Sequence, residues 1–209
     1  MNQAKRIEIL TRLREQNPHP TTELEYNSPF ELLIAVILSA QATDKGVNKA
    51  TAKLFPVANT PQAILDLGLE GLKEYIKTIG LYNSKAENII KTCRDLVEKH
   101  NGEVPESREA LEALAGVGRK TANVVRGNWY HIPSVVVDTH VKRVSNLLGL
   151  TKNEDPVKIE FDLMQLVPKD KWIDINTQMI AHGRKICIAR RPKCQECFLL
   201  PYCTGGKAL

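Results

Sequence analysis

The chain has 209 residues, of which 43% are hydrophobic and only 5% aromatic, and it carries a formal net charge of +5. This length provides for one or two domains with a core, and apolar residues that are mainly Leu, Ile, Val and Ala favour packed helices. No run of about eighteen apolar residues occurs, which excludes a membrane-spanning helix. The N-terminus lacks a hydrophobic signal region, so we expect a cytoplasmic protein with reduced thiols.

The first third of the chain is predicted to form a series of helices. Residues 3–16 have the pattern of a charged amphipathic helix. Ser28 and Pro29 supply an N-cap and a first-turn proline ahead of residues 30–38, which are apolar nearly all round and predict a central, buried helix. Further helices are expected from Thr43 or Asp44 to about Phe55, from Thr60-Pro61, and over 69–76.

A long helix is predicted to follow. The sequence Ser84-Lys85-Ala86-Glu87 has the pattern of a capping box, and apolar residues recur at helical spacing as far as Val97. Cys93 falls on this apolar face and is interpreted as a core thiol. The sequence His100-Asn101-Gly102 closes the helix, and a short one runs from Ser107 to Leu114.

Two glycines then precede another helix, predicted over 119–126. Gly116 and Gly118 allow a tight turn and a close approach of the backbone to a partner, and a helix start can hold a phosphate with its free N–H groups. Arg119 and Lys120 lie on the first turn of that helix, where a positive surrounding favours the neutral, nucleophilic amine. The alternative is an ordinary turn followed by a solvated lysine.

The remainder is also predicted to be helical. Pro133–Val137 has the propensity of a short strand, but no partner strand is visible. Asp138 is placed to cap a helix that ends near Leu148, Asp155-Pro156 starts the next, and another runs from about Lys171 to Lys185. The fold class is therefore expected to be all-α.

Four cysteines crowd the C-terminal region with the spacing Cys-x6-Cys-x2-Cys-x5-Cys. Four thiolates can bind one zinc ion or a [4Fe–4S] cube, and so compact a loop favours the cube over two separated zinc knuckles. The loop is basic, which suits an anionic cluster or DNA phosphates, but it can also be only a staple for the fold. The predicted ligands are Cys187, Cys194, Cys197 and Cys203.

The glycine turn, Lys120, the sequence Val137-Asp138-Thr139-His140-Val141 and the cysteine spacing together resemble the endonuclease III family, bacterial DNA glycosylases that are also AP lyases. The segments 38–44 and 80–86 are similar to the DNA-probing loops of that family. The resemblance covers nearly the whole chain. It implies two helical domains flanking a DNA-binding cleft, with a loop where propensity suggests a strand at 134–137.

The resemblance also implies domain bounds and partners. Residues 21–132 are expected to form a six-helix domain ending in a helix–hairpin–helix motif at about 108–127, and residues 1–20 with 133–209 a second domain containing the iron–sulfur loop 187–203. The implied partner is double-stranded DNA containing oxidised pyrimidines or abasic sites, bound by a monomer close to the nucleoid.

Residue roles follow from the same resemblance. Lys120 matches the catalytic lysine, whose amine attacks the sugar C1′ and forms a Schiff base, and Asp138 matches the essential carboxylate, although an N-cap alone remains an alternative. Gln41 and Leu81 match residues that fill the gap left by a flipped base. The DNA-binding set expected from these motifs is Gln41, Leu81, Asn83, Gly116, Gly118, Arg119 and His140. A structural role remains open for His140, and Glu112 is either a water-orienting group or an exposed helix residue.

Two positions depart from the family pattern. Ala115 replaces the usual proline of the hairpin, and Arg126 stands where an apolar residue is common, which puts the packing at the end of that helix in question. The rival functions are a monofunctional adenine glycosylase, against which Lys120 argues, a non-catalytic DNA-binding module, and a zinc-stapled adaptor.

Overall fold

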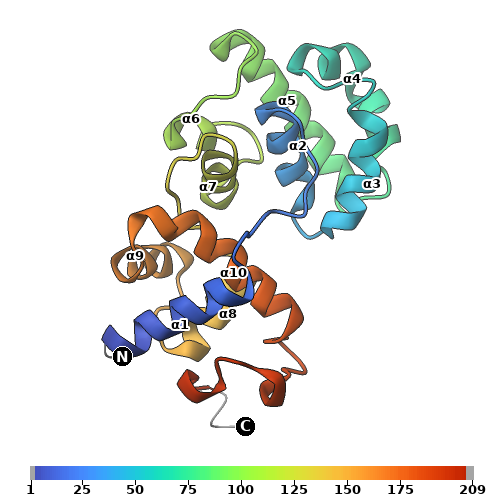
Figure 1. Cartoon of the computed structure of the whole chain (residues 1–209). Helices are drawn as coiled ribbons and strands as arrows, with labels where there is room; N and C mark the ends of the chain where they lie inside the picture. Colours follow the sequence, from blue (N-terminus) through green and yellow to red (C-terminus); the bar gives the residue numbers. More distant parts are fainter. Residues whose placement is uncertain (1–2, 206–209) are drawn as a thin grey trace. The chain divides into compact units, whose positions relative to one another are not determined.

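The computed structural model describes residues 3–205, and every regular element in that range is helical (Figure 1). The all-α prediction is confirmed. Contacts divide these residues into two compact units. One spans Glu23–Ile132, and the other comprises the residues up to Thr22 and those from Pro133 onward. None of the described helices is long and apolar enough to cross a membrane.

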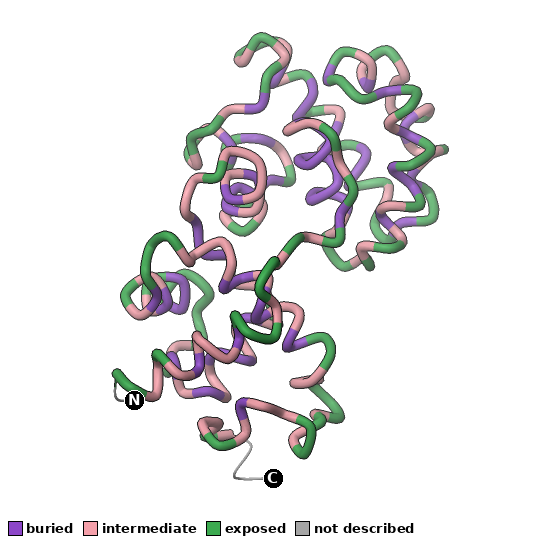
Figure 2. Tube along the Cα trace, in the orientation of Figure 1, coloured by how far each residue is buried: buried purple, intermediate pink, exposed green. Residues whose placement is uncertain are grey.

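The unit Glu23–Ile132 is built around one buried helix, α2 (Pro29–Ser39). All residues from Phe30 to Leu38 are buried, as Figure 2 shows, and this confirms the prediction of a central helix. Ser28 caps it, its Oγ accepting a hydrogen bond from the Glu31 N–H at 3.0 Å. The helices that surround it are α3 (Asp44–Leu54), α4 (Pro61–Ile76), α5 (Tyr82–His100), α6 (Arg108–Glu112) and α7 (Arg119–Asn128).

Two helices in this unit, α4 and α5, test the helix boundaries that were predicted from capping residues. Helix α4 contains a kink at Gly68 (φ 74°), so the two short helices predicted here are present end to end. The predicted capping box at Ser84 is wrong. Helix α5 begins two residues earlier at Tyr82, and its N-cap is Leu81 in the left-handed region, with no side-chain capping bond.

The second unit packs α1 (Gln3–Gln16) and α8 (Thr139–Leu148) against α10 (Trp172–Lys185), with α9 (Pro156–Leu166) beside them. Its core includes Ile9, Val144, Leu163 and Met179. Three short 3₁₀ turns complete it: η1 (Lys169–Lys171), η2 (Cys194–Glu196) and η3 (Leu200–Tyr202).

The stretch 134–137 is not a strand in the structure but an extended segment that has no strand beside it in the described chain. A side chain takes the place of the missing strand. Asn176 on α10 accepts from the Val136 N–H at 3.0 Å and donates to the Ser134 carbonyl at 2.9 Å. The segment 134–137 is therefore extended because its backbone bonds to the side-chain amide of Asn176, not because it belongs to a sheet. This agrees with the loop that the family resemblance implies at these residues.

Candidate functional site

The glycine turn ahead of α7 is a hydrogen-bonded reversal over Leu114–Val117, in which the Val117 N–H donates to the Leu114 carbonyl at 3.1 Å. Gly116 has φ 75°, and a Cβ added to it would lie 3.1 Å from the Asn88 side chain. Both facts require glycine there. The Ala115 carbonyl is held at 2.8 Å by the Thr92 hydroxyl on α5, so the turn stays anchored although the usual proline is absent.

Gly118 differs from Gly116. It is the N-cap of α7, with φ −95°, and no side chain caps the helix start. A Cβ built on it would meet nothing within 4 Å, and the residue is exposed. The fold itself thus does not require glycine at 118, and no side chain at that position covers the N-terminus of α7, the kind of helix end that favours anions. The Lys120 side chain is exposed on the first turn behind it.

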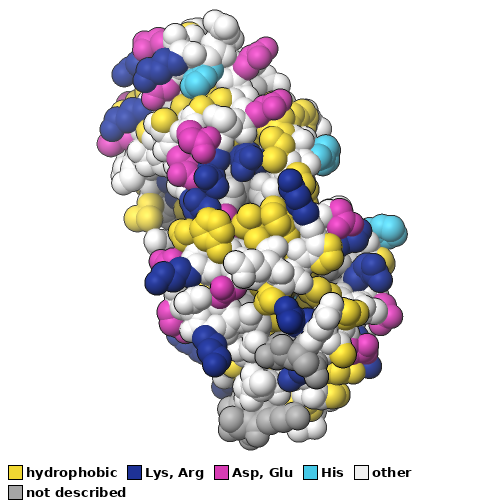
Figure 3. Space-filling model, turned by 90° about the vertical axis from the view of Figure 1, so that its left-hand side faces the viewer, with side chains coloured by type: hydrophobic (Ala, Val, Ile, Leu, Met, Phe, Trp, Pro, Cys, Tyr) yellow, Lys and Arg dark blue, Asp and Glu magenta, His cyan; other side chains and the backbone are white. Residues whose placement is uncertain are grey.

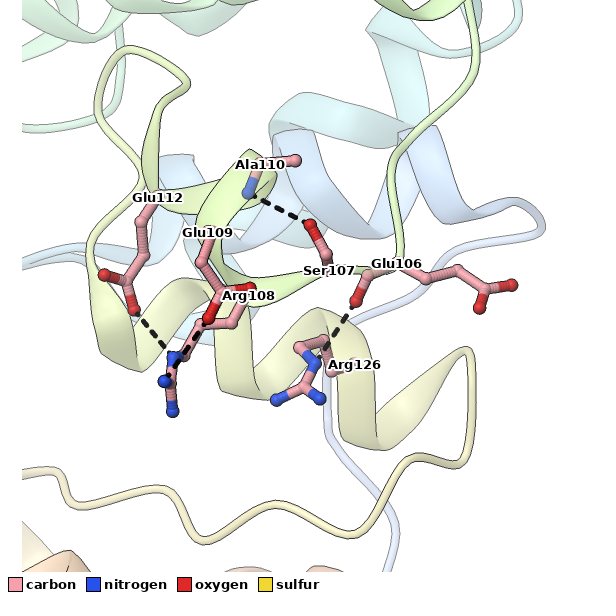
Figure 4. A network of polar contacts seen from close by, with 7 residues as sticks. All are labelled: Glu106, Ser107, Arg108, Glu109, Ala110, Glu112 and Arg126. Carbon is pink, nitrogen blue, oxygen red and sulfur yellow. Dashed lines mark hydrogen bonds and ion pairs between the residues drawn. The ribbon is translucent and has the colours of Figure 1, made fainter.

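Figure 4 shows how the hairpin is braced. Arg126 on α7 donates from Nε to the Glu106 carbonyl at 3.2 Å, which ties the end of α7 to the residue before the Ser107 cap of α6. This explains the arginine at a position where the family usually has an apolar residue, and α7 runs on to Asn128. Glu112 lies 3.6 Å from Arg108 Nε, so its carboxylate is engaged within α6.

The two predicted probing residues share an unusual backbone conformation. Gln41 has φ 55° and Leu81 has φ 60°, both in the left-handed region, where residues other than glycine are strained. Leu81 is 59% exposed, which is high for a large apolar side chain. Asn83 is exposed on the first turn of α5. Asn101 and His131 also have positive φ. It is therefore the exposure of Gln41 and Leu81 together with their strain that agrees with the predicted role.

Asp138 is the N-cap of α8, as predicted, and its Oδ1 accepts from the Val141 N–H at 2.8 Å. The cap fixes the direction of the carboxylate. His140, two residues later, is half-buried against α10, because a Cβ at Gly183 would lie 2.9 Å from the His140 Cβ. Burial lowers the pKa of His140, Asp138 opposes this, and Arg143 and Arg184 lower it further. Its DNA contact stays a prediction.

The four predicted metal ligands line one small cavity at the end of the second unit. Cys187, Cys194, Cys197 and Cys203 are joined there by apolar side chains such as Leu148 and Leu200. Within the described residues, no group of three or more His, Cys, Asp or Glu side chains is disposed to hold a single metal ion. The four thiols that line this one cavity are the donor set that an iron–sulfur cube takes.

Arg143 on α8 was not singled out from the sequence, yet it ties the cysteine loop to its own helix. Its guanidinium donates to the Cys187 carbonyl from Nε at 3.1 Å and from Nη2 at 2.8 Å, and also to the Gly183 carbonyl at 2.9 Å. No local sequence signal marks this residue, because its acceptors lie 40 or more positions away.

Each unit thus gathers its own share of the predicted residues. The unit Glu23–Ile132 contains Gln41, Leu81 and the hairpin, whereas Asp138, His140 and the cysteines lie in the other. On the face shown in Figure 3, basic and acidic side chains are interspersed, in keeping with the net charge of only +5. No single sign of charge dominates that face.

Comparison with known proteins places these features in a family. Residues 34–169 match the family model of the HhH-GPD superfamily of base excision DNA repair proteins, and residues 187–203 match the iron–sulfur binding domain of endonuclease III. The chain is 71% identical over 203 residues to endonuclease III of Haemophilus influenzae, covering 97% of this chain and 96% of the relative. For endonuclease III of Escherichia coli the identity is 63%, with the same coverage.

Solved structures agree. A trapped covalent intermediate of endonuclease III with DNA and a non-covalent endonuclease III–DNA complex both align with a TM-score of 0.96 at 44% identity, over 100% of this chain and 98% of theirs. A thermostable thymine-DNA glycosylase aligns with a TM-score of 0.88 at 25% identity, over 99% of this chain and 98% of that one.

Proposed function

This chain belongs to the endonuclease III family of base excision DNA repair proteins, and from that premise we propose that Lys120 and Asp138 carry its DNA glycosylase and AP lyase activity. The observation that supports this most is that Lys120 is exposed on the first turn of α7, directly behind a helix start whose N-cap, Gly118, has no side chain. A phosphate held by that N-terminus would bring the deoxyribose of a bound strand to the amine.

The proposed chemistry uses one amine and one carboxylate. The neutral Lys120 amine attacks C1′, a new C–N bond forms, and the bond from C1′ to the base breaks, with the base leaving as it gains a proton. The attached amine loses a proton and the C1′–O4′ bond breaks as O4′ gains one, which opens the sugar and leaves a Schiff base at C1′. This Schiff base makes a C2′ proton acidic. Loss of that proton expels the 3′ phosphate by β-elimination, and water then releases the lysine. Asp138, held by its own cap at Val141, is proposed to take the proton of the attacking amine or to stabilise positive charge at the sugar.

DNA is the partner, and we propose the contacts that hold it. The Gly116 and Gly118 backbone and Arg119 would bind phosphates, while Gln41 would bond to the base left without a partner and Leu81 would hold the opened step apart. Asn83 would assist at the same loop and His140 near Asp138. We further propose that the damaged bases are oxidised pyrimidines such as thymine glycol, that the monomer acts alone, and that it works on the nucleoid in the cytoplasm.

The protein has a [4Fe–4S] cluster, and the proposed ligands are the four cysteines of the loop 187–203. Because all four ligand positions are cysteines, the group supplies structural order to the loop and offers no open iron site. Arg190 and Arg191 within the loop are exposed, and in this proposal they would bind phosphates.

Borohydride trapping tests the central proposal. A duplex with a single thymine glycol is incubated with the protein and borohydride, which reduces a Schiff base to a stable protein–DNA bond. The wild-type chain is expected to crosslink, whereas Lys120→Gln is expected to bind DNA without crosslinking or nicking. Lys91→Gln, which changes an exposed lysine on α5, is the matched control and should crosslink normally.

The outcomes separate the rival functions. Nicking by Lys120→Gln at the wild-type rate would remove the amine from the mechanism. Base release by the wild-type chain without any crosslink would make it a monofunctional glycosylase that uses water, and binding without either reaction would make it a DNA-binding module.

A further inference from the structure

Lys85 is a buried lysine in the unit Glu23–Ile132. Only 5% of the residue is exposed, and it lies on the same helix face as the core residues Ile89 and Leu96. Its Nζ donates to the Leu38 carbonyl at 2.9 Å and to the Ala40 carbonyl at 2.6 Å, both more than forty residues away in sequence. Burial lowers the pKa of this amine. Burying a lysine amine costs free energy unless it is hydrogen-bonded, so its burial indicates a role other than filling space in the core.

One reason lies at the C-terminal end of α2. The last carbonyls of a helix have no partner within the helix, and a cation is favoured beside them. Helix α2 has no basic residue in its last turn. The Ser39 hydroxyl donates to the Val36 carbonyl at 2.8 Å, so the helix satisfies that carbonyl itself. Lys85 on α5 supplies a donor to the later carbonyls of Leu38 and Ala40, and the positive charge that this helix end lacks.

A second consequence concerns the conformation of Gln41. Residues 39–42 form a turn closed by the bond from the Ala42 N–H to the Ser39 carbonyl at 3.1 Å. Ala40 has φ −58° and ψ 117°, and Gln41 has φ 55°, which are the angles of a type II turn. A type II turn differs from a type I turn by a flip of the central peptide, here the one between Ala40 and Gln41.

Lys85 donates a hydrogen bond to the carbonyl of this same Ala40–Gln41 peptide. In the type I form Gln41 would take a relaxed negative φ, so the backbone alone favours the flip. The flip would carry the Ala40 oxygen away from Lys85 Nζ and leave the buried amine with one acceptor fewer. Lys85 therefore opposes the relaxation and holds Gln41 in its strained orientation.

Lys85 is also joined to the second probing loop. Its own N–H donates to the Leu81 carbonyl at 3.0 Å, across the first turn of α5. The loops touch as well, because a Cβ added to Gly80 would lie 3.9 Å from the Gln41 carbonyl oxygen. Lys85 is thus hydrogen-bonded to the carbonyl of Ala40, the residue before Gln41, and to the carbonyl of Leu81.

We propose that Lys85 is a positioning residue for opening DNA: it locks the Ala40–Gln41 peptide in the type II form and couples the Gln41 and Leu81 loops into one rigid pair. The inference rests on the proposed roles of Gln41 and Leu81. It assigns Lys85 no contact with substrate.

The test compares a closed and an open substrate. Borohydride trapping rates are measured for wild type, Lys85→Met and Lys91→Met on a paired duplex containing thymine glycol, and on the same strand with the lesion inside a bubble of mismatches. Lys85→Met is expected to crosslink about 10- to 100-fold more slowly on the paired duplex, since a misplaced group of this kind can cost that much. On the bubble, where no base needs to be held apart, its rate should come within about threefold of wild type. Lys91→Met should match wild type on both.

A merely structural lysine would give another result. If Lys85→Met slows both substrates equally, or neither, the positioning role is wrong. If the wild-type chain crosslinks to neither substrate, the proposed glycosylase–lyase function fails instead, so the two failures are distinguishable. Should Lys85→Met not fold, Lys85→Arg keeps a buried cation with altered geometry and is expected to show the same loss confined to the paired duplex.

A double-mutant cycle gives a second readout. Gln41→Ala, Lys85→Met and the double variant are compared on the paired duplex. If the lysine acts through Gln41, the double variant should be hardly slower than the slower single variant, because the glutamine is already misdirected. Additive losses would show that the lysine acts by another route.

Discussion

At the scale of single residues, the two glycines of the turn before α7 differ in what their conformation and surroundings require. Gly116 is required by its positive φ and by contact with Asn88, whereas Gly118 has an ordinary φ and open space where a Cβ would be. The first glycine therefore serves the fold, and the second leaves room for a ligand. Asp138 combines both demands, because one carboxylate oxygen caps α8 while the group as a whole is proposed to act on the sugar.

The glycines can be separated by substitution. Gly118→Ala is expected to leave the free energy of unfolding nearly unchanged and to weaken DNA binding about 10- to 150-fold, because a charge-assisted hydrogen bond worth about 1.5–3 kcal/mol is obstructed. Gly116→Ala should instead destabilise the protein by about 1–2 kcal/mol, since alanine is strained at positive φ. Urea unfolding and DNA titration at fixed salt measure the two effects. Equal stability losses in the two variants would contradict this assignment.

Asp138 permits a similar separation. Asparagine caps helices as well as aspartate does, so Asp138→Asn should remain folded while the trapping rate falls by about 100-fold or more. Asp138→Ala also loses the cap and should unfold more easily, by about 0.5–2 kcal/mol. Thermal unfolding combined with trapping distinguishes the variants. An unfolded Asp138→Asn protein would mean that the cap is the dominant role.

At the scale of elements, the helices begin and end where short polar signals stand. Ser28, Thr43, Thr60, Ser107 and Asp155 all cap helices through their side chains. Helices α5, α7 and α10 start without a side-chain cap. The first turn of α5 is set instead by the left-handed Leu81 and by the contacts of Lys85. The turn before α7 depends likewise on a partner from α5, the Thr92 hydroxyl.

This turn offers a prediction about stability. Ala115 is the second residue of a turn whose third residue, Gly116, has φ 75°, and proline is favoured at that position of a type II turn. Ala115→Pro is expected to raise the free energy of unfolding by about 0.4–1 kcal/mol by restricting the unfolded chain. Urea unfolding measures it, with trapping activity retained. A destabilised variant would show that the Ala115 backbone does not have the φ that proline needs.

At the scale of the whole molecule, the two units rely on different sources of stability. The unit Glu23–Ile132 has a large apolar core around α2, while the other unit adds a loop of short 3₁₀ turns whose cysteines line one cavity. Burial raises the pKa of the Cys187 and Cys197 thiols. A metal that binds such thiols displaces their protons, so we expect cluster binding to add to the folding free energy of this loop.

Removing one predicted cluster ligand should lower the iron content, whereas removing the core thiol Cys93 of the other unit should not. Cys197→Ala is expected to lose the brown colour and most of the roughly four irons per chain that a cube contains, and to unfold at a lower temperature. Cys93→Ala is the matched control. Cys93 is fully buried in the core of the unit Glu23–Ile132, so its loss should lower stability through a cavity while iron is kept. Zinc without iron in the wild-type protein would overturn the cluster.

Local patterns in the sequence were enough to predict the helical class, most helix starts, the burial of α2 and the group of four cysteines. Capping residues, apolar periodicity and ligand spacing all lie within a few positions of one another in the chain. The residues proposed for catalysis and DNA contact came instead from the resemblance of short motifs to a known family, and their roles stay predictions. Only the tertiary structure decided that Lys85 belongs to the end of α2 rather than to a capping box, that Asn176 replaces a strand beside 134–137, and that Arg143 holds the cysteine loop. The physical reason is shared by all three. A buried polar group must find its partner wherever packing places one, and those partners lie about forty or more residues away, where no local pattern records them.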